Sequence, residues 1–391
     1  MAQTRTSTTF PPPVMEARRW LEGVEFPADR PLINVSQAAP VDPPPLALRQ
    51  AMAEFTVEQD NAHLYGPVLG NDDLRFKLAA QISEHYAATV SAEQIAITSG
   101  CNQAFAAVIS AITDQGDEVI LPTPWYFNHK MWLDMAGVKT IDLPTGEDLL
   151  PDPDKARALI TDNTRAISLV TPNNPGGVEY PSDLVRRFYD LARETGIRLL
   201  VDETYRDFDS RTAAPHDLFQ QPGWEDTFVH LYSFSKAYRL TGHRVGAIAT
   251  GALLLAEIEK FLDTVAICPG QIGQFAAHWG MQNLSQWVAG ERDEILDRRA
   301  AIAEGMPLLE AKGWRLLGLG AYFAYLEHPF DIPSDELARQ LVPEAGILLL
   351  PGTMFMPAHD TAGKQQVRIA FANLDRAGIT QLFDRLQAMS F

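Results

Sequence analysis

Cysteine, basic residues and long apolar runs are all scarce in this chain of 391 residues. Its two cysteines, Cys101 and Cys268, exclude a disulfide framework and a cysteine-rich zinc site, and they fit a reducing compartment. The 32 Lys and Arg against 50 Asp and Glu give a net charge of −18, which repels nucleic acid and anionic membranes. No apolar run reaches the roughly 20 residues of a membrane helix, and Met1–Pro12 lacks the apolar run of a signal peptide. We therefore expect a soluble cytoplasmic protein that binds neither nucleic acid nor membranes.

The common signatures of metal and nucleotide sites are missing as well. The nine histidines form no His-Glu-x-x-His pattern, and the chain has neither a Gly-x-x-x-x-Gly-Lys-Ser/Thr loop nor a Gly-x-Gly-x-x-Gly fingerprint. The sequence therefore gives no support for a metal ion, for ATP bound by a phosphate loop or for a dinucleotide. A cofactor, if there is one, must be held by another arrangement.

From about Gln94 the chain alternates short apolar runs with amphipathic segments, which is typical of an α/β protein. The clearest helix, Pro181–Thr195, is followed by the stop signal Gly196. Strands that are apolar on both faces and alternate with helices predict a large, mostly parallel sheet covered by helices on both sides. In such sheets the ligand lies at the carboxyl ends of the strands. The predicted strands are Ile95–Thr98, Glu118–Leu121, Val138–Leu143, Ala166–Val170, Ile197–Val201, Phe228–Leu231 and Val245–Thr250.

The two ends of the chain do not follow this pattern. We expect residues 1–48 to form an N-terminal arm, flexible at the prolines 11–13, and part of a smaller α+β domain. Residues 49–287 then form the large, cofactor-binding domain, and residues 288–391 complete the smaller one. The elements predicted for the C-terminal part are a charged helix over Glu291–Lys312, a strand at Tyr322–Glu327, a helix from Ser334 and a strand at Val367–Phe371.

The segment Ser233-Phe234-Ser235-Lys236 carries the first candidate for chemistry. A lysine forms a Schiff base with an aldehyde cofactor, and a hydroxyl three residues before it and Arg244 eight residues after it can bind a phosphate. The pattern Ser-x-x-Lys alone is equally compatible with a solvent-exposed lysine on the surface, because most lysines are exposed.

A second candidate, Asp202, directly follows the apolar run Ile197–Val201 and so belongs at the carboxyl end of a buried strand. A carboxylate there can pair with the protonated pyridine nitrogen of pyridoxal 5′-phosphate (PLP), or it can cap a helix. Three residues later, Tyr205 can reach the ring's phenolic oxygen or be an ordinary buried tyrosine.

Two more polar segments follow predicted strands. Thr171–Gly177 contains two prolines and two glycines that fix a turn, and within it Asn174 offers an amide donor. Thr98–Gln103 opens a predicted helix over Asn102–Ile112, so its backbone N–H groups and the helix dipole suit a bound phosphate.

Taken together, the motifs resemble those of the class I/II aminotransferases of PLP fold type I, the aspartate aminotransferase-like family. The resemblance spans roughly Tyr65 to Phe371 and implies the fold of that family. The motifs are Ser-Gly-x-x-x-Ala at 99–104, Asn-Asn-Pro-x-Gly at 173–177, Asp-x-x-Tyr at 202–205, Ser-x-Ser-Lys-x-x-x-x-x-Gly-x-Arg-Val-Gly at 233–246 and Val-Arg-Ile-x-Phe at 367–371.

The resemblance implies a role for each cofactor-binding residue. Lys236 would carry PLP as an internal aldimine and move protons, and Asp202 would bind the pyridine nitrogen. Tyr205 and Asn174 would bind the ring oxygen, and Tyr126, two residues after a proline, would stack on the ring. The phosphate would be held by the backbone of Ser99, Gly100 and Cys101, by the Ser233 hydroxyl and by Arg244.

It also implies roles around the cofactor. Trp125 would form a nearby wall, and His129 lies where some family members support the aspartate, although a lone helical histidine is more often structural. Tyr65 matches a tyrosine that touches the phosphate of the neighbouring subunit, which implies a homodimer. Arg368, with Asn174, would clamp the α-carboxylate of the substrate.

Two positions depart from the family pattern. Ala38 occupies a place in the substrate loop where many members carry glycine, and its methyl group can narrow the site or move the loop. Gly176 makes the asparagine loop Pro-Gly-Gly where Pro-Thr-Gly or Pro-Leu-Gly is commoner. Both leave the cofactor chemistry intact and bear on the choice of substrate.

The resemblance implies an aminotransferase that moves the amino group of an L-amino acid to a 2-oxo acid by a ping-pong mechanism. We expect pyruvate or 2-oxoglutarate as acceptor, whereas the donor stays open between aromatic, large aliphatic and other amino acids. The alternative on the same fold is a PLP-dependent carbon–sulfur β-lyase, which the motifs around the cofactor do not separate from an aminotransferase. A PLP-binding transcription regulator would need a basic DNA-binding domain, for which we see no room. A non-catalytic scaffold does not account for Lys236, Asp202 and Arg368.

Overall fold

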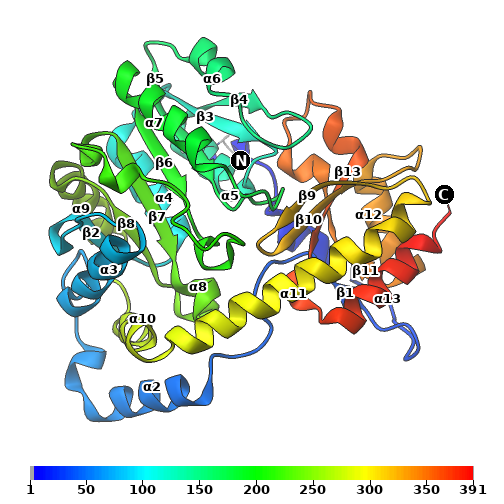
Figure 1. The fold of residues 1–391 in the computed structure, drawn as a ribbon, viewed down its shortest axis with the longest axis horizontal. Helices are drawn as coiled ribbons and strands as arrows, with labels where there is room; N and C mark the ends of the chain where they lie inside the picture. Colours follow the sequence, from blue (N-terminus) through cyan, green and yellow to red (C-terminus); the bar gives the residue numbers. More distant parts are fainter. Residues whose placement is uncertain (1–3, 391) are drawn as a thin grey trace.

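The computed structural model describes residues 4–390, so Met1–Gln3 of the predicted arm and Phe391 of the predicted C-terminal domain lie outside the described residues. Figure 1 shows a large domain and a smaller one, with the long helix α11 (Ser285–Glu310) running from the first to the second. Within residues 4–390 no helix is long and apolar enough to span a bilayer.

The large domain is built on a seven-stranded sheet in the order β2-β8-β7-β6-β5-β3-β4 within the described residues. β8 runs antiparallel to both neighbours, and the other pairs are parallel. The sheet is therefore mostly parallel, as the alternating pattern predicts. The strands are β2 (Ile95–Thr98), β3 (Glu118–Thr123), β4 (Lys139–Pro144), β5 (Thr164–Val170), β6 (Arg198–Asp202), β7 (Phe228–Ser233) and β8 (Gly246–Ala249).

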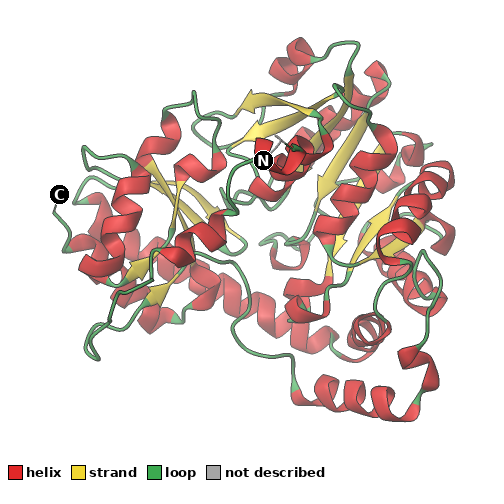
Figure 2. Ribbon diagram, turned by 180° about the vertical axis from the view of Figure 1, so that it is seen from behind, coloured by secondary structure: helices red, strands yellow, loops and turns green. Residues whose placement is uncertain are grey.

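Helices cover both faces of this sheet, which is seen from behind in Figure 2. In β6, Leu199 and Val201 belong to one apolar cluster and Leu200 to another, because successive side chains of a strand point to opposite faces. The first cluster includes side chains of α3, α7 and α10, and the second those of α4, α5 and α9. The helices of this domain are α2 (Leu46–Glu58), α3 (Asp72–His85), α4 (Cys101–Ile112), α5 (Phe127–Ala136), α6 (Pro153–Leu159), α7 (Ser182–Thr195), α8 (Phe234–Ala237), α9 (Ala252–Ala266) and α10 (Gln271–Asn283).

The register of the sheet brings the ends of five strands to one edge. Val170 at the end of β5 lies opposite Asp202 at the end of β6. Gly246, the first residue of β8, lies opposite both Ser233 at the end of β7 and Thr98 at the end of β2. Because β8 is antiparallel, its amino end joins the carboxyl ends of the other strands, so the segment before it also reaches the ligand edge.

The smaller domain combines both ends of the chain, as predicted. Ile33 and Asn34 of β1 pair in parallel with Ile347 and Leu348 of β11, and a second, antiparallel sheet has the order β12-β13-β10-β9. The fold class predicted from the sequence is therefore confirmed. The remaining elements are α1 (Pro13–Arg19), β1 (Ile33–Asn34), β9 (Arg315–Gly320), β10 (Phe323–Glu327), α12 (Ser334–Ala345), β11 (Ile347–Leu348), β12 (Leu350–Pro351), β13 (Gln366–Ala370) and α13 (Arg376–Gln387).

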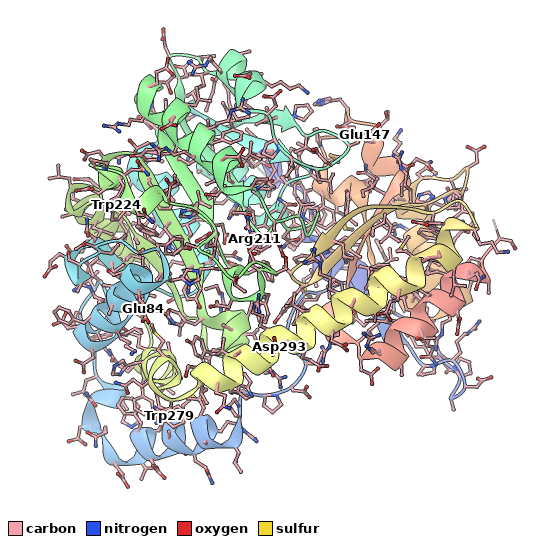
Figure 3. All side chains as sticks on the ribbon, viewed as in Figure 1. Glu84, Glu147, Arg211, Trp224, Trp279 and Asp293 are labelled. Atoms are coloured by element: carbon pink, nitrogen blue, oxygen red, sulfur yellow. The ribbon has the colours of Figure 1, made fainter. Side chains whose placement is uncertain are left out.

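Helix α11 ties the two domains together. The Arg292 guanidinium donates hydrogen bonds to the carbonyls of Asp209 (2.9 Å) and Ser210 (3.1 Å) in the large domain. Figure 3 labels Arg211, which follows these two residues, and Asp293 on α11, and it shows side chains in the region between them. The predicted domain boundary between residues 287 and 288 falls in the first turn of α11, and the division into 1–48, 49–287 and 288–391 stays a prediction.

The N-terminal prolines differ from the expected flexible arm. Pro13 begins α1, and both Pro13 and Ala17 are buried. Proline suits the first position of a helix because its fixed φ is helical and its missing N–H has no helical partner there. α1 lies close to β12 and covers one side of the cavity described below.

Candidate active site

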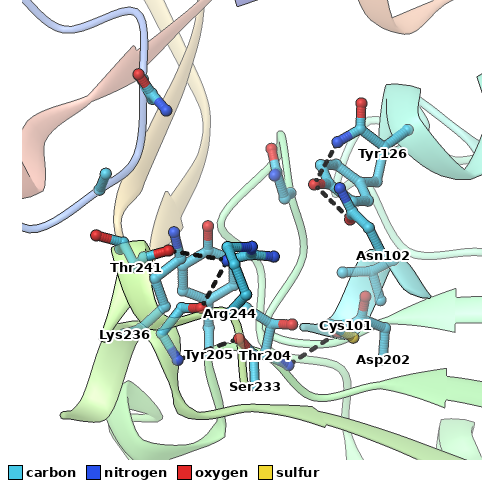
Figure 4. Close-up of a pocket in the computed structure, with 16 residues that line it drawn as sticks. Cys101, Asn102, Tyr126, Asp202, Thr204, Tyr205, Ser233, Lys236, Thr241 and Arg244 are labelled. Carbon is cyan, nitrogen blue, oxygen red and sulfur yellow. Dashed lines mark hydrogen bonds between the residues drawn. The ribbon is translucent and has the colours of Figure 1, made fainter. Parts of the chain in front are cut away.

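A cavity of about 260 Å³ lies at the ligand edge of the large sheet. Figure 4 shows the residues that line it, which come from the N-terminal segment, the starts of α4 and α5, the ends of β5, β6 and β7 with the residues that follow them, and the segment before β8. Its lining is Gln37, Ala39, Cys101, Asn102, Tyr126, Asn128, Val170, Asn174, Asp202, Thr204, Tyr205, Ser233, Ser235, Lys236, Thr241 and Arg244.

Lys236 lies in the short helix α8, directly after β7. Its Nζ donates a 2.6 Å hydrogen bond to the carbonyl of Ala38 and lies 5.8 Å from the centre of the Tyr205 ring. Burial, together with the nearby charges of Arg244 and Arg368, lowers the pKa of Lys236 to about 8. Near neutral pH this lysine is therefore free amine, the form that attacks an aldehyde, far more often than an ordinary lysine is.

Asp202 is the buried acid of the cavity, with only 3% of its surface exposed. Its Oδ1 accepts a hydrogen bond from the backbone N–H of Thr204 (2.9 Å), and its Oδ2 lies 3.3 Å from His129 Nε2. Burial alone raises the pKa of a carboxyl group, but these contacts prevail and hold the pKa of Asp202 below its usual value. His129 is itself buried and stacks on Phe105 at 3.8 Å, so its ring is fixed by packing.

One end of the cavity is suited to an anion. Gly100, with φ of +89°, precedes α4, whose first backbone N–H groups face this end. A β-carbon on Gly246 would lie 2.6 Å from the carbonyl carbon of Gly100, so the two backbones cross in close contact. Arg244 Nη1 donates to the Thr241 carbonyl (3.0 Å) and to Ser235 Oγ (3.4 Å). Both partners are neutral, and among residues 4–390 no carboxylate lies within 4.0 Å of this arginine to neutralise it.

Arg368, in the middle of β13, provides a second anion-binding group at the opposite side. Its side chain is 2% exposed and lies between the rings of Phe323 and Phe355, 5.1 and 5.0 Å from their centres. Nη1 donates to Asn174 Oδ1 (3.0 Å) and Nη2 to the carbonyl of Ser36, whereas Nε has no hydrogen-bond partner among the described residues. Burial lowers the pKa of Arg368 to about 10, which leaves it charged at neutral pH.

A second cavity of about 310 Å³ adjoins the first and connects Lys236 and Arg368 to the N-terminal segment. Tyr126, Asn174 and Tyr205 belong to the walls of both cavities. Its lining is Pro12, Pro13, Val14, Met15, Arg18, Gln37, Ala38, Tyr126, Phe127, Asn128, Asn174, Tyr205, Lys236 and Arg368.

Most of the residues singled out in the sequence meet at these two cavities. Ser99 and Gly100 precede the lining residue Cys101, although the Ser99 N–H is already bonded to Gln103 Oε1 at 2.5 Å. Trp125 lines neither of them and belongs instead to a separate small cavity that Tyr126 and His129 also line. Tyr65 contributes nothing to either cavity of its own chain, and 80% of its surface is exposed.

Sequence reasoning missed several polar lining residues. The clearest are Asn102 and Asn128, which hold the Tyr126 hydroxyl at 3.3 and 2.9 Å. Both stand in the first turn of a helix that follows a strand, and that position was the signal available in the sequence. The other missed polar residues are Arg18, Gln37, Thr204, Ser235 and Thr241.

Comparison with known proteins identifies this arrangement. The model of the family described as aminotransferase class I and II matches residues 30–386. The chain belongs to this family of aminotransferases. The aromatic aminotransferase ISS1 of Arabidopsis thaliana is 30% identical over 300 residues, 74% of this chain and 73% of the relative. An aspartate aminotransferase of Pyrococcus abyssi is 26% identical over 321 residues, 79% of each chain.

The solved structures agree on the fold of this aminotransferase. A single mutant of the Thermus thermophilus aspartate aminotransferase superposes with a TM-score of 0.87 at 24% identity and covers 98% of both chains. The resemblance stated from the motifs is therefore confirmed at the level of family, enzyme class and fold.

The two departures from the family pattern have local explanations in this aminotransferase. The Ala38 methyl group is buried in the core of the smaller domain, and its carbonyl faces Lys236. A β-carbon on Gly176 would lie 2.8 Å from Leu149 Cδ1 and 2.9 Å from Asn173 Oδ1. The side chain of Leu149 therefore fills the space that a larger residue at position 176 would need.

Proposed function

We propose that this aminotransferase uses PLP to move the amino group of an L-amino acid to a 2-oxo acid. The observation that carries the proposal is the meeting of Lys236, Asp202 and Arg368 around two adjoining cavities, although they come from three different elements. An amine with a lowered pKa, a buried carboxylate and a carboxylate-binding guanidinium are the groups that such a transfer needs.

The residues fit PLP along the whole length of the first cavity. The amino end of α4, the Ser233 hydroxyl and the uncompensated Arg244 suit a doubly charged phosphate. Asp202 suits a protonated pyridine nitrogen, and the Lys236 amine suits the aldehyde. Asn174 and Tyr205 line the wall beside Lys236, where they suit the ring oxygen.

The roles of the side chains follow from these positions. When bound, PLP supplies an electron sink for the electron pair left at the substrate Cα. Lys236 would hold the cofactor, and its amine, once free, would remove the Cα proton of the substrate and return it to the carbon that had been the cofactor's aldehyde. Arg368 holds the α-carboxylate, and Asp202, kept ionised by Thr204 and His129, keeps the ring nitrogen protonated.

Two half-reactions use the same site in turn. The first would take up water and release a 2-oxo acid while the amino group stays in the site, and the second would pass this group to another 2-oxo acid. Because the first product leaves before the second substrate binds, we propose ping-pong kinetics. Steady-state rates at several fixed acceptor concentrations then give parallel lines in double-reciprocal plots.

We further propose that the enzyme is a homodimer in which Tyr65 reaches the phosphate of the partner. Tyr65 and its neighbour Leu64 are 80% and 63% exposed, and Val57 on α2 is 85% exposed. Apolar side chains this exposed on neighbouring segments favour a protein interface. Light scattering should give twice the monomer mass of 43.3 kDa, and a monomer with full activity would contradict the shared site.

The absorbance spectrum of the purified enzyme with PLP tests the proposed cofactor site. We expect a cofactor band that an amino donor bleaches and a 2-oxo acid restores. Lys236→Ala should lose the lysine-linked band and slow the reaction by about 10² to 10⁴-fold, the usual contribution of a general acid–base group. A variant that keeps the wild-type band and rate would contradict the assignment.

The same experiment separates the β-lyase alternative. A lyase releases pyruvate and ammonia from a substrate such as cystathionine without any 2-oxo acid acceptor, whereas an aminotransferase stops after one turnover when the acceptor is left out. Ammonia that accumulates over many turnovers without acceptor would favour the lyase.

A further inference from the structure

The second cavity contains a cation that the proposed function leaves unused. Three basic side chains line it, Arg18, Lys236 and Arg368, and no acidic side chain does. Lys236 serves the cofactor, and Arg368, buried at the inner end, serves the α-carboxylate. Arg18 is exposed on α1, so it stands at the outer end of the same cavity.

The surroundings of Arg18 leave its charge available. Its Nη2 donates a 2.7 Å hydrogen bond to Gln37 Oε1, a neutral partner, and no carboxylate among residues 4–390 lies within ion-pair distance. By contrast, Arg19 and Arg339 both pair with Glu16, at 2.7 and 3.7 Å.

The lining of this cavity also contains apolar side chains. Val14, Met15 and Phe127 belong to it, beside polar residues such as Gln37 and Asn128, and they suit the methylene groups of a substrate side chain better than its charged end. The position of Arg18 is also fixed: Asn373 Nδ2 holds the backbone carbonyl of Gln37 at 2.7 Å, and two residues of α1 are buried in the protein.

We infer that Arg18 binds the distal carboxylate of a dicarboxylic substrate while Arg368 binds its α-carboxylate, an inference that rests on the proposed function. The cavity then has a cation for each carboxylate, and its lining includes apolar side chains for the chain that joins them. A 2-oxo acid that carries a carboxylate on its side chain is therefore favoured over a neutral acid of the same length.

The test uses enzyme loaded with pyridoxamine phosphate, in a single turnover that needs no known donor. Its rate is measured with 2-oxoglutarate and with 2-oxopentanoate, which has the same chain length and no distal carboxylate. Arg18→Gln and Arg18→Met should lower the rate constant for 2-oxoglutarate about tenfold, the effect of losing a charged contact at a partly exposed site. The rate for 2-oxopentanoate should change less than about twofold. Arg19→Met, one residue further along the exposed side of α1, is the matched control and should leave both rates unchanged.

A second readout does not depend on turnover. Titration calorimetry of the PLP-loaded enzyme with succinate and with butyrate should show tighter binding of succinate, and only Arg18 variants should abolish the difference. An unchanged preference between the two acids in both Arg18 variants would overturn the inference, as would an equal loss for the neutral acid. A wild-type enzyme that reacts with neither 2-oxo acid would contradict the proposed function instead, and the calorimetry would then decide the role of Arg18 by itself.

Discussion

The contact of Arg368 with a carboxylate gives the most sharply defined prediction. Arg368→Lys keeps the positive charge but replaces a planar fork of donors with a single ammonium group. At present Nη1 and Nη2 hold Asn174 Oδ1 and the Ser36 carbonyl, and the buried side chain between two phenylalanine rings has little freedom to move. A lysine at position 368 can make one of the two hydrogen bonds of the guanidinium group and not both.

The loss is one charge-assisted hydrogen bond to the substrate carboxylate, about 1.5–3 kcal/mol. Since each 1.36 kcal/mol is tenfold, kcat/KM for the amino donor should fall about 10- to 150-fold. The absorbance of the cofactor should not change, because Arg368 does not line the first cavity. Arg376→Lys is the matched control. Arg376 pairs with Asp297 on the surface, so its replacement by lysine should change kcat/KM less than about twofold. If Arg368→Lys keeps kcat/KM within about threefold of the wild type, the carboxylate clamp is wrongly assigned.

Further perturbations address the other groups of the site. Asp202→Asn should bind PLP yet lower kcat/KM about 10- to 150-fold, and a wild-type rate would refute the pyridine contact. The rate at which cofactor-free enzyme binds PLP should rise with pH through a midpoint near 8, because deprotonation frees the Lys236 amine. A midpoint near the pKa of an ordinary lysine would contradict the lowered pKa of Lys236. His129→Phe removes a contact that lowers the pKa of Asp202, so the acid limb of kcat/KM should move to higher pH, and an unmoved limb would make His129 purely structural. Gly177→Ala should lower the free energy of unfolding, measured in urea, by about 1–3 kcal/mol more than Gly196→Ala does. Both glycines have positive φ, but only at Gly177 would a β-carbon meet backbone, 2.6 Å from the Phe323 carbonyl oxygen. Equal losses of stability in the two variants would contradict this reasoning.

Strand positions were predictable because burial on both faces leaves a strong pattern. The predicted Ile95–Thr98 agrees with β2 at both ends, and the polar residues after the runs that form β2, β5, β6 and β7 lie at the ligand edge. The antiparallel direction of β8 was not readable, because strand direction depends on the connection and not on the apolar pattern. The start of α11 at Ser285, before the predicted Glu291, was also missed.

The residues of the site likewise divide into those that the sequence could predict and those that only the fold reveals. Lys236 and Asp202 follow strands and carry a chemical signature, so their side chains could be singled out. The carbonyls of Ser36 and Ala38, which contact Arg368 and Lys236, could not, since every residue has a carbonyl and only the fold selects these two. Arg18 lies on a short helix after a run of prolines, and its role depends on a cavity formed by residues from both ends of the chain.

The fate of a labelled amino group tests the central claim most directly. The enzyme, loaded with PLP, is incubated with a panel of ¹⁵N-labelled amino acids and an unlabelled 2-oxo acid, and the products are followed by mass spectrometry. We predict that the label appears in the amino acid that corresponds to the added 2-oxo acid, in an amount equal to the 2-oxo acid released from the donor. Label recovered as free ammonium, with none in a new amino acid, would contradict amino-group transfer as the reaction of this site.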